Sequence, residues 1–425
     1  MSEPLLVLLD GKICGELQRL RGGKYEFTYA NDWQGFPLSL SMPIGGGKYT
    51  GEVVSNYFWG LLTDNEFILR SWAKAAQISW RNLFGLLAEV GEDCAGAVQV
   101  LTPEKYGNIN ARKRRKLQWL SEADIAERLR ELGKDQAAWR RPDDIGRLSL
   151  AGALPKTAFL FEKGRWAIPS GHIPTTHIFK PPMQGLDGQA VNEHICLRLA
   201  QSIGLPAANS QVMSFEDQSA IVVERYDRLP TAKGKYQRLH QEDMCQALGL
   251  SPNLKYQNDG GPSVGDITGL IRNVSSRPDT DVEVFIKAQM LNWLIGGTDA
   301  HAKNYSLLLL PGGNIGLAPL YDITATLPFY EYEQPKLKLA MKVGKHYALR
   351  RISGRDWKRL GDSAGVRFAQ IENWMEEVSM QIMPNLETII DETRNERLDH
   401  KIMDDMQRLI AAHMKICARQ FRDQK

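Results

Sequence analysis

The sequence has few cysteines, little net charge and few long apolar runs. Its five cysteines are scattered over 425 residues without a CxxC pair, a pattern that fits a reducing cytoplasm better than a disulfide framework or a zinc site. The net charge of +3 is too small to predict nucleic-acid binding on charge alone. No segment reaches the roughly 18 to 20 apolar residues that span a bilayer, and the first apolar run is too short for a signal peptide. We expect a cytoplasmic protein with no membrane association.

What is present is the composition of a globular protein. Hydrophobic residues make up 43% of the chain and charged residues 24%, so two or three domains with sizeable cores are expected. Changes in the sequence pattern predict four parts. Residues 1–105 form an α+β module, 106–145 a linker with a helix, 146–240 a sheet-rich portion and 241–425 a helical portion.

The first hundred residues alternate between strand and helix patterns. The run LLVLLDGKICGEL predicts a hairpin that turns at Asp10 and Gly11. PLSLSMP (37–43) alternates like a further strand, and the apolar spacing over 53–76 predicts one or two helices.

A basic run and a helix signal follow this module. RKRRK, from Arg112 to Lys116, has two interpretations: a nucleic-acid contact or, more commonly for a charge run, a solvated connector. Ser121 and Asp124 have the spacing of a capping box, which opens a helix. The β-rich runs that come next predict a mainly antiparallel sheet, interrupted by one helix that stops at Gly204.

The stretch GGTDAHAKNYS (296–306) crowds polar residues between two apolar segments. Asp299 and Asn304 have the spacing between the base and the metal-binding asparagine in the kinase pattern HRDxxxxN. Further on, Asp322 ends the predicted strand LAPLYDI, where a second Mg²⁺ ligand should lie. We interpret Asp299 as a proton acceptor and the other two as metal ligands. A helix cap or Asx-turn at Asp299 and a strand-end turn at Asp322 are the alternatives.

Two other side chains of this stretch suit a nucleotide better than zinc. His301 has no His or Cys partner at zinc-ligand spacing, so we expect it to orient the loop or to touch the nucleotide. Lys303 is either a phosphate contact or a side chain in solvent.

Other parts of a phosphoryl-transfer site are predicted upstream. Lys180 ends the alternating run THIFK and is a candidate for the cation that reaches the phosphates, with Glu193 on the next helix as its ion-pair partner. Glu224, Arg225 and Tyr226 follow an apolar strand and suit a hinge whose backbone binds adenine. An exposed strand end or helix surface is the alternative for each of these positions.

One segment has the position of a phosphate loop without its composition. The loop consists of Ala151, Gly152, Ala153, Leu154, Pro155 and Lys156. It has one glycine, no GxGxxG pattern and a proline that lacks a backbone N–H. From residue chemistry alone it stays unassigned.

The order and spacing of these motifs resemble the HipA family of serine/threonine protein kinase toxins. The resemblance covers nearly the whole chain and is carried by LSLAGALPKTA, IPTTHIFK, NEHICLRLA, VERYDR, QEDMCQALG, KYQNDGGP, LNWLIGGTDAHAKNYS, LYDI and LKLAMKVG. It implies an α+β, protein-kinase-like (phosphatidylinositol-kinase-like) fold. A small N-terminal α+β subdomain and an all-helical C-terminal lobe would belong to that fold.

The resemblance also implies a role for each candidate residue. Asp299 would be the catalytic base, and Asn304 and Asp322 would bind Mg²⁺. ATP would be held by Ala151 to Lys156, Lys180, Glu224, Arg225, Tyr226, His301, Ala302, Lys303, Asn304, Tyr321 and Asp322. Ser149 occupies the position that such kinases autophosphorylate, and a dianionic phosphate there would expel the loop and disfavour ATP binding.

A role in growth arrest is implied as well. Kinases of this family phosphorylate an aminoacyl-tRNA synthetase, typically glutamyl-tRNA synthetase. A HipB-like helix-turn-helix antitoxin binds them and tethers them to operator DNA, so DNA is reached mainly through the antitoxin. This chain departs from the familiar pattern in two places: Leu154-Pro155 replaces Gln-Glu in the loop, and Tyr226 replaces Phe.

Two other functions fit the same residues. A small-molecule phosphotransferase on this fold would use the same Asp299, Asn304 and Asp322, because the acceptor pocket has no readable pattern. A largely non-catalytic co-repressor, recruited to DNA by a partner, is compatible with the low net charge. Phosphate uptake by a protein would separate the kinase from both.

Overall fold

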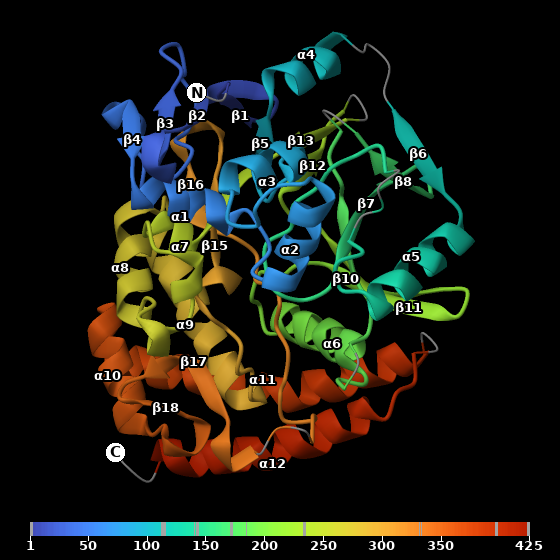
Figure 1. The fold of residues 1–425 in the computed structure, drawn as a ribbon. Helices are drawn as coiled ribbons and strands as arrows, with labels where there is room; N and C mark the ends of the chain where they lie inside the picture. The colour runs from blue at the N-terminus through green and yellow to red at the C-terminus, as the bar shows by residue number, and fades with distance from the viewer. Residues whose placement is uncertain are drawn as a thin grey trace. The chain divides into compact units, whose positions relative to one another are not determined.

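The computed structural model describes residues 3–111, 116–139, 141, 144–170, 173–183, 185–232, 235–330, 332, 334–395 and 398–422 (Figure 1). The chain forms two compact units. The first consists of Met1–Pro181, Met213–Asn253 and Ser306–Ile315, and the second of Pro182–Val212, Leu254–Tyr305 and Gly316–Lys425. No described helix is both long and apolar enough to cross a membrane. Arg112 to Arg115 of the basic run lie outside the described residues, so both interpretations of that run stay open.

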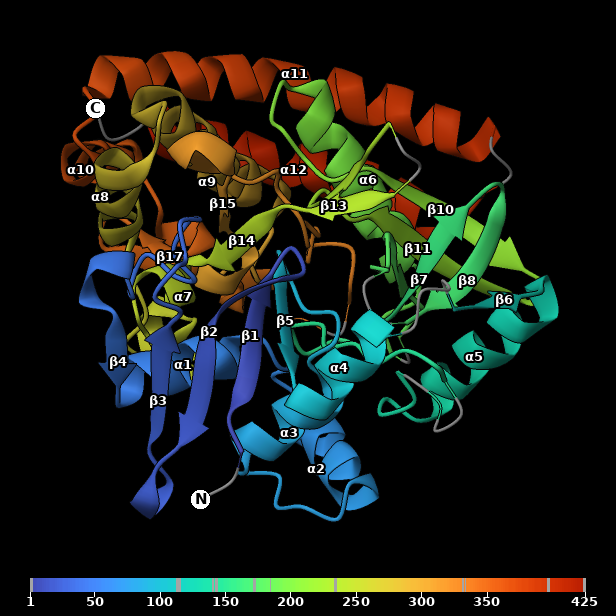
Figure 2. The same ribbon diagram turned by 90° about the horizontal axis from the view of Figure 1, so that it is seen from above.

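A five-stranded antiparallel sheet begins the first unit. It is built from β1 (Leu5–Leu9), β2 (Lys12–Arg19), β3 (Tyr25–Tyr29), β4 (Lys48–Thr50) and β5 (Val98–Leu101), in the order β4-β3-β2-β1-β5 (Figure 2). β1 and β2 pair across Asp10 and Gly11, whose φ angles of 48° and 76° are the left-handed values of a tight hairpin turn. The predicted hairpin is confirmed.

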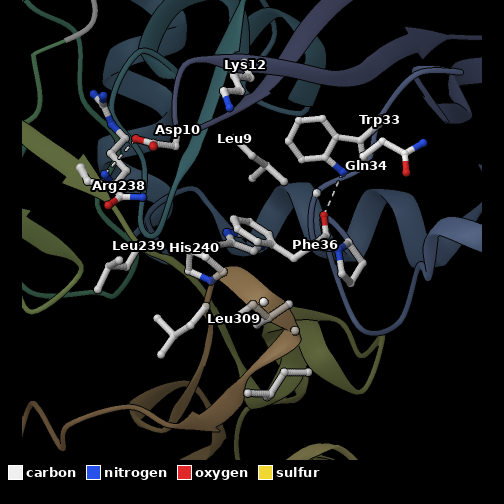
Figure 3. A pocket seen from close by; sticks show the side chains of 18 residues that line it. Leu9, Asp10, Lys12, Trp33, Gln34, Phe36, Arg238, Leu239, His240 and Leu309 are labelled. Carbon is white, nitrogen blue, oxygen red and sulfur yellow. Dashed lines mark hydrogen bonds between the residues drawn. The ribbon is translucent and has the colours of Figure 1, made fainter.

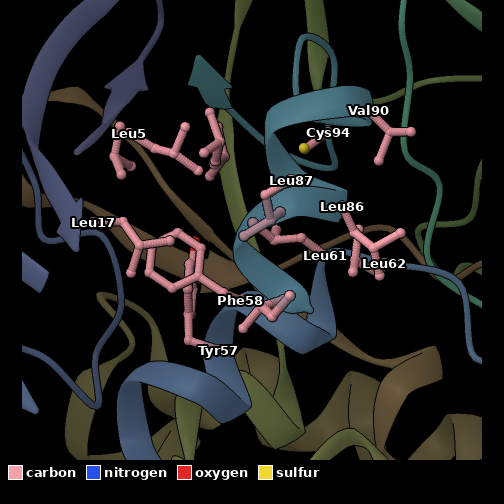
Figure 4. Packing of buried hydrophobic residues seen from close by; sticks show 14 of the residues in the cluster. Leu5, Leu17, Tyr57, Phe58, Leu61, Leu62, Leu86, Leu87, Val90 and Cys94 are labelled. Carbon is pink, nitrogen blue, oxygen red and sulfur yellow. The ribbon is translucent and has the colours of Figure 1, made fainter. Parts of the chain in front are cut away.

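Four helices accompany this sheet: α1 (Glu52–Gly60), α2 (Glu66–Ala75), α3 (Leu83–Val90) and α4 (Pro103–Ala111). α1 contacts β3 and β4, whereas α3 and α4 contact β5. Figure 4 shows the apolar core, in which Leu5 and Leu17 of the sheet lie near Phe58, Leu61 and Leu87. Full burial of a side chain of this size contributes about 1.5–3 kcal/mol. The helices predicted over 53–76 are confirmed as α1 and α2.

The strand predicted over 37–43 was wrong. That segment forms turns with one isolated bridge, between Ser39 and Met42. The Tyr29 hydroxyl donates to the Met42 carbonyl and accepts from the Leu38 N–H. Because a side chain satisfies these backbone groups, they need no neighbouring strand.

A second sheet has six strands in the order β10-β11-β9-β7-β8-β6. Its strands are β6 (Leu117–Leu120), β7 (Thr157–Glu162), β8 (Arg165–Pro169), β9 (His177–Lys180), β10 (Ser210–Phe215) and β11 (Gln218–Glu224). The β6–β8, β7–β8, β7–β9 and β9–β11 pairs are antiparallel, as the sequence predicts. Helix α5 (Glu122–Lys134) begins at the predicted capping box of Ser121 and Asp124 and contacts β11.

Shorter elements connect these parts. They are β12 (Arg228–Pro230), β13 (Tyr236–Arg238), β14 (His240–Asp243), α7 (Met244–Ala247), β15 (Ser306–Leu309) and β16 (Ile315–Leu317). β14, β15 and β16 form a three-stranded sheet, and β12 pairs with β13. The 3-10 helices are η1 (Arg21–Gly23), η2 (Ile44–Gly46), η3 (Pro252–Leu254), η4 (Gln257–Asp259), η5 (Ala302–Asn304), η6 (Pro311–Gly313), η7 (Gln334–Lys336) and η8 (Leu349–Arg351).

The second unit is mainly helical. It contains α6 (Gln189–Ser202), α8 (Val264–Val274), α9 (Pro278–Ile295), α10 (Gly354–Ala364), α11 (Phe368–Asn395), α12 (Ile402–Arg422) and a hairpin of β17 (Lys338–Val343) and β18 (His346–Ala348). Helix α9 is buried along most of its length and contacts α8, α11 and α12. It starts at Pro278, which suits the first turn, and stops at Gly296 with a left-handed φ of 70°. The candidate catalytic stretch therefore follows directly from a buried helix.

All five cysteines are buried and carry free thiols. Burial raises the pKa of the Cys94 and Cys196 thiols to about 12, because a thiolate would lose its hydration there. These thiols therefore stay protonated at neutral pH.

Candidate active site

The loop after α9 holds Asp299 and Asn304 in one short turn of chain. The Asn304 side-chain N–H donates to the Asp299 carbonyl oxygen at 2.9 Å, and the His301 N–H donates to the same oxygen at 2.8 Å. The Asn304 N–H in turn donates to the His301 carbonyl. These bonds fix the backbone around Asp299, while its carboxylate remains exposed to solvent.

A tyrosine from a separate segment supports the Asp299 carboxylate. The Tyr256 hydroxyl donates to Asp299 Oδ1 at 2.5 Å. The Tyr256 ring meets the buried His301 ring edge to face, with the two centroids 5.0 Å apart. The Ala302 N–H donates to the carbonyl of Lys255. The 255–256 segment thus orients both the carboxylate and the loop that carries it.

Asp322 lies close to Asn304, but not at the end of a strand as predicted. β16 ends at Leu317, and Asp322 has a left-handed φ of 52°, which is uncommon for a residue other than glycine. The chain leaves the strand because Leu320 bonds to a different segment, accepting from the Ala208 N–H and donating to the Pro206 carbonyl. That pairing redirects the backbone before Asp322.

A small cavity of about 10 Å³ joins the two candidate metal ligands. It is lined by Ala288, Leu291, Asn292, Ala300, Asn304, Tyr305, Leu320, Tyr321, Asp322 and Ile323. Asn304 uses its side-chain N–H on the Asp299 carbonyl, so its Oδ1 is the atom that could act as a ligand. Among the described residues, no three His, Cys, Asp or Glu side chains gather as a metal site. Mg²⁺ typically takes one or two protein oxygens and completes its shell with phosphate and water, which fits this pair.

His301, Ala302 and Lys303 in the same stretch are buried. His301 and Lys303 are each 5% exposed, which rules out the alternative that Lys303 lies in solvent. The Tyr321 hydroxyl donates to the Lys303 carbonyl at 2.8 Å and so ties the Asp322 segment to the loop. His301 packs against Tyr256, and its role in orienting the loop or touching the nucleotide stays a prediction.

The first unit contains the candidate phosphate loop. Gly152 has a φ of 100°, a value that side chains other than hydrogen rarely allow. The Lys156 ammonium folds back on the loop and donates to the Ala151 carbonyl at 2.5 Å. Ser149 is fully buried, and its hydroxyl donates to the Leu61 carbonyl at 2.7 Å.

Lys180 and Glu193 belong to different units. Lys180 is 8% exposed at the end of β9, where it pairs with Ile221 of β11. Glu193 lies on α6 in the second unit and is also buried. Their ion pair stays a prediction.

The candidate hinge begins where β11 ends at Glu224. The Arg225 N–H donates to the Thr176 carbonyl at 2.8 Å, and the Arg225 carbonyl accepts from the Arg228 N–H at 3.1 Å, so both backbone groups of Arg225 already have partners within the protein. The Arg225 guanidinium is buried and binds Asp227. Tyr226 lies between these two charged residues, and its binding role stays a prediction.

Arg225 is part of a buried charge cluster, formed by Asp93, Arg225, Asp227, Arg228 and Arg238, whose side chains are at most 7% exposed. Arg228 contacts Asp93 at 3.0 Å, and Arg238 does so at 3.2 Å. Burial opposes the charge of Asp93, but the arginines outweigh it and hold the pKa of its carboxyl well below the usual range. The cluster joins the segment after α3 to the hinge.

A larger cavity of about 580 Å³ lies elsewhere in the first unit (Figure 3). Trp33, Phe36 and His240 line it, and the Phe36 and His240 rings stack with centroids 5.3 Å apart. Burial lowers the pKa of His240 to about 4, so its imidazole is neutral at physiological pH. None of the predicted kinase residues is among the residues that line this cavity.

Family models match both halves of the chain. The model of the HipA-like C-terminal domain matches residues 148–386, and that of the HipA N-terminal domain matches residues 5–101. The chain belongs to the HipA kinase family. The protein "Putative kinase Y4mE" of Sinorhizobium fredii is 38% identical to this chain over 372 residues, which cover 85% of this chain and 86% of Y4mE.

Two Shewanella oneidensis comparisons extend this assignment. The serine/threonine-protein kinase toxin HipA of that organism is 31% identical over 343 residues, which cover 75% of this chain and 73% of the relative. A solved structure of HipA from the complex with HipB and operator DNA superposes with a TM-score of 0.81 at 24% identity, covering 99% and 98% of the two chains. The predicted HipA fold is confirmed, with the β17–β18 hairpin inside its helical C-terminal part.

Sequence reasoning missed the role of Tyr256 in this HipA-family site. The segment KYQNDGGP was among those that carried the resemblance, but nothing in it points to Asp299. The two residues are 43 positions apart, and no periodic pattern links them. An aromatic residue beside a Gln-Asn-Asp-Gly-Gly turn was the one local signal.

Proposed function

We propose that this chain is an ATP-dependent serine/threonine protein kinase that acts as the toxin of a toxin–antitoxin pair. The observation that carries the proposal is the arrangement of the 299–304 loop. Asp299 offers an exposed carboxylate, and Asn304 fixes that loop while lining a cavity together with Asp322. A kinase needs a proton acceptor on the same loop as one Mg²⁺ ligand, with a second oxygen ligand close to the first.

Each residue has a role in this proposal. Asp299 accepts the proton of the substrate hydroxyl while that oxygen attacks phosphorus. Asn304 and Asp322 hold Mg²⁺, which when bound neutralises charge on the phosphate oxygens. The phosphates are bound by the loop Ala151–Lys156 and by Lys180. The rest of the nucleotide is bound by Glu224, Arg225, Tyr226, His301, Ala302, Lys303 and Tyr321.

Intact-mass spectrometry tests the kinase activity. Purified wild type and Asp299→Ala are incubated with Mg²⁺-ATP and then mapped by peptide. We expect wild type to gain about 80 Da on the peptide that contains Ser149, and the variant to gain nothing. If wild type binds ATP and stays unmodified, and no added protein takes up phosphate, the kinase proposal is wrong.

The substrate that we propose is an aminoacyl-tRNA synthetase, with glutamyl-tRNA synthetase as the first choice because of the family resemblance. Phosphorylation of this enzyme would inhibit translation and growth. The test is incubation of purified host synthetases with the kinase and ATP, followed by phosphopeptide mapping and aminoacylation assays. Phosphate on a metabolite and on none of the proteins would favour the small-molecule phosphotransferase.

The partners that we propose are a helix-turn-helix antitoxin and, mainly through it, operator DNA. The Shewanella oneidensis HipA, whose solved structure includes HipB and operator DNA, supports this proposal. We expect a small helix-turn-helix protein to be encoded beside this chain and to co-purify with it. In gel-shift assays the pair should retard operator DNA, whereas the kinase alone should not.

A further inference from the structure

The candidate phosphate loop is docked on the turn between α1 and α2. Thr63 Oγ1 donates to the Gly152 carbonyl at 2.9 Å, and the Asp64 N–H donates to the same oxygen at 3.2 Å. Thr63 and Gly152 also form an isolated parallel bridge. Thr63 is 3% exposed, so water does not easily replace these bonds.

Asn65 binds the loop from the next position. Its Oδ1 caps α2 by accepting from the Phe67 and Ile68 N–H groups at 3.0 and 3.4 Å. Its Nδ2 donates to the Ala153 carbonyl at 3.4 Å and to Gln136 Oε1 at 3.1 Å. Aspartate would cap the helix equally well, but only the amide can also donate to the loop.

The result is that three consecutive loop carbonyls are occupied. Ala151 accepts from Lys156, Gly152 from the 63–65 turn, and Ala153 from Asn65. A loop that cradles phosphates presents N–H groups to them, and carbonyl oxygens facing the phosphates would repel them. The 63–65 turn binds two of the three carbonyls and so keeps them from facing the phosphates.

Ser149 is hydrogen-bonded to two segments of the N-terminal module. Its hydroxyl donates to Leu61, the residue two positions before Thr63, and its N–H donates to the Asp93 carbonyl at 2.9 Å. The side chain is fully buried. Ser149 can therefore attack a phosphorus atom only after the loop leaves the 61–65 segment.

We propose that Thr63 and Asn65 are positioning residues that hold the phosphate loop in its nucleotide-binding conformation and, by doing so, protect Ser149 from phosphorylation. This inference rests on the kinase function proposed above. In the protected reaction, the Ser149 oxygen bonds to the γ-phosphorus as the bridging bond to ADP breaks, and its proton passes to the catalytic carboxylate. The N-terminal module thus sets how often the kinase inactivates itself.

Hydrogen exchange tests the docking without any enzymatic step. Thr63→Val removes the hydroxyl and keeps the shape, Thr63→Ser restores the hydroxyl, and Thr50→Val is a control at an exposed position of the same module. In the Asp299→Ala background without nucleotide, we expect the 149–156 peptide of Thr63→Val to exchange about two- to tenfold faster, as one lost hydrogen bond predicts. Thr63→Ser and Thr50→Val should exchange like the parent.

Asn65→Asp separates the loop contact from the helix cap. The carboxylate still caps α2, but it places an oxygen opposite the Ala153 carbonyl. We expect an unchanged melting temperature together with faster exchange over 149–156. Asn65→Ala should lower the melting temperature as well, because it loses the cap.

Nucleotide binding and modification complete the test. We expect Thr63→Val and Asn65→Asp to weaken binding of Mg²⁺-ATP about two- to tenfold in the Asp299→Ala background. In the active background at saturating ATP they should raise the rate of Ser149 phosphorylation by a similar factor. Unchanged exchange, affinity and rate in both variants would overturn the inference. If wild type neither binds ATP nor modifies Ser149, the kinase proposal fails, whereas the exchange data still decide whether the loop is docked.

Discussion

The buried charge cluster of the first unit and the 299–304 loop of the second use the same side-chain chemistry in opposite ways. In the cluster, Asp93 and Asp227 are enclosed by three arginines, and each carboxylate has its partners within the protein. In the loop, the Asp299 carboxylate is exposed and has one described partner, the Tyr256 hydroxyl. Charges that are satisfied internally stabilise a fold, whereas a carboxylate that is oriented but exposed is ready for a ligand.

The comparison predicts the largest effect on activity at Asp299. Asp299→Asn keeps the size of the side chain and removes the proton acceptor. We expect the rate of phosphoryl transfer to fall about 10²–10⁴-fold, with the melting temperature of wild type. A variant that keeps more than a tenth of the rate would show that Asp299 is not the base.

At Asp93 we expect the main effect to be on stability instead of on the rate of phosphoryl transfer. Asp93→Asn removes a buried carboxylate that Arg225, Arg228 and Arg238 share, and breaking such a buried ion pair typically costs about 3–5 kcal/mol. Urea denaturation followed by circular dichroism measures this change. Asp279→Asn, at an exposed pair with Arg272, is the matched control and should leave the denaturation midpoint in place. Equal midpoints for both variants would contradict a structural role for the cluster.

Glu242 sharpens the comparison, because it is buried beside hydroxyl and N–H donors instead of arginines. It accepts from Ser39 Oγ at 2.6 Å and from the Leu40 N–H at 2.8 Å. Burial raises the pKa of its carboxyl from 4.5 to about 8. The unfolded chain therefore releases this proton at lower pH than the folded chain does. The stability contribution is complete below about pH 4.5 and is lost as the pH rises through 8.

Glu242→Gln should remove this pH dependence. We expect the variant to gain stability relative to wild type between pH 5 and pH 8, by up to a few kcal/mol at the upper end. Urea midpoints at several pH values measure the difference. Parallel curves for the two proteins would show that Glu242 does not titrate in this range.

The smallest effect is expected at Tyr256. Tyr256→Phe removes one hydrogen bond to the Asp299 carboxylate, worth about 1 kcal/mol at an exposed site. We expect the rate constant of phosphoryl transfer to fall about fivefold and the KM for ATP to stay unchanged. A rise in KM alone would place Tyr256 in nucleotide binding instead of carboxylate orientation.

Local signals allowed much of this structure to be predicted. The Asp10-Gly11 hairpin and the capping box at Ser121 both act within a few residues, and the structure contains the local geometry that each predicts. The base and metal-ligand roles of Asp299 and Asn304 stay predictions. The family resemblance added the fold. The domain boundaries, the Lys180–Glu193 pair and the nucleotide contacts stay predictions.

What could not be predicted depends on distant partners. Asp322 was placed at the end of the predicted strand LAPLYDI, but β16 ends at Leu317 and Leu320 bonds to the 206–208 segment instead. The bond from Thr63 to Gly152 spans 89 positions. No composition or period in either segment indicates such a contact, because it exists only once both segments are folded.

The five buried thiols make it possible to measure the unfolding of this protein by chemical labelling. A disulfide reagent reacts with thiolates. Burial of the thiols, together with the raised pKa of Cys94 and Cys196, therefore keeps the folded protein from reacting with it. Cys14, Cys94 and Cys245 lie in the first unit, and Cys196 and Cys417 in the second. The rate at which each cysteine is labelled therefore reports how often its own unit opens, without any introduced probe.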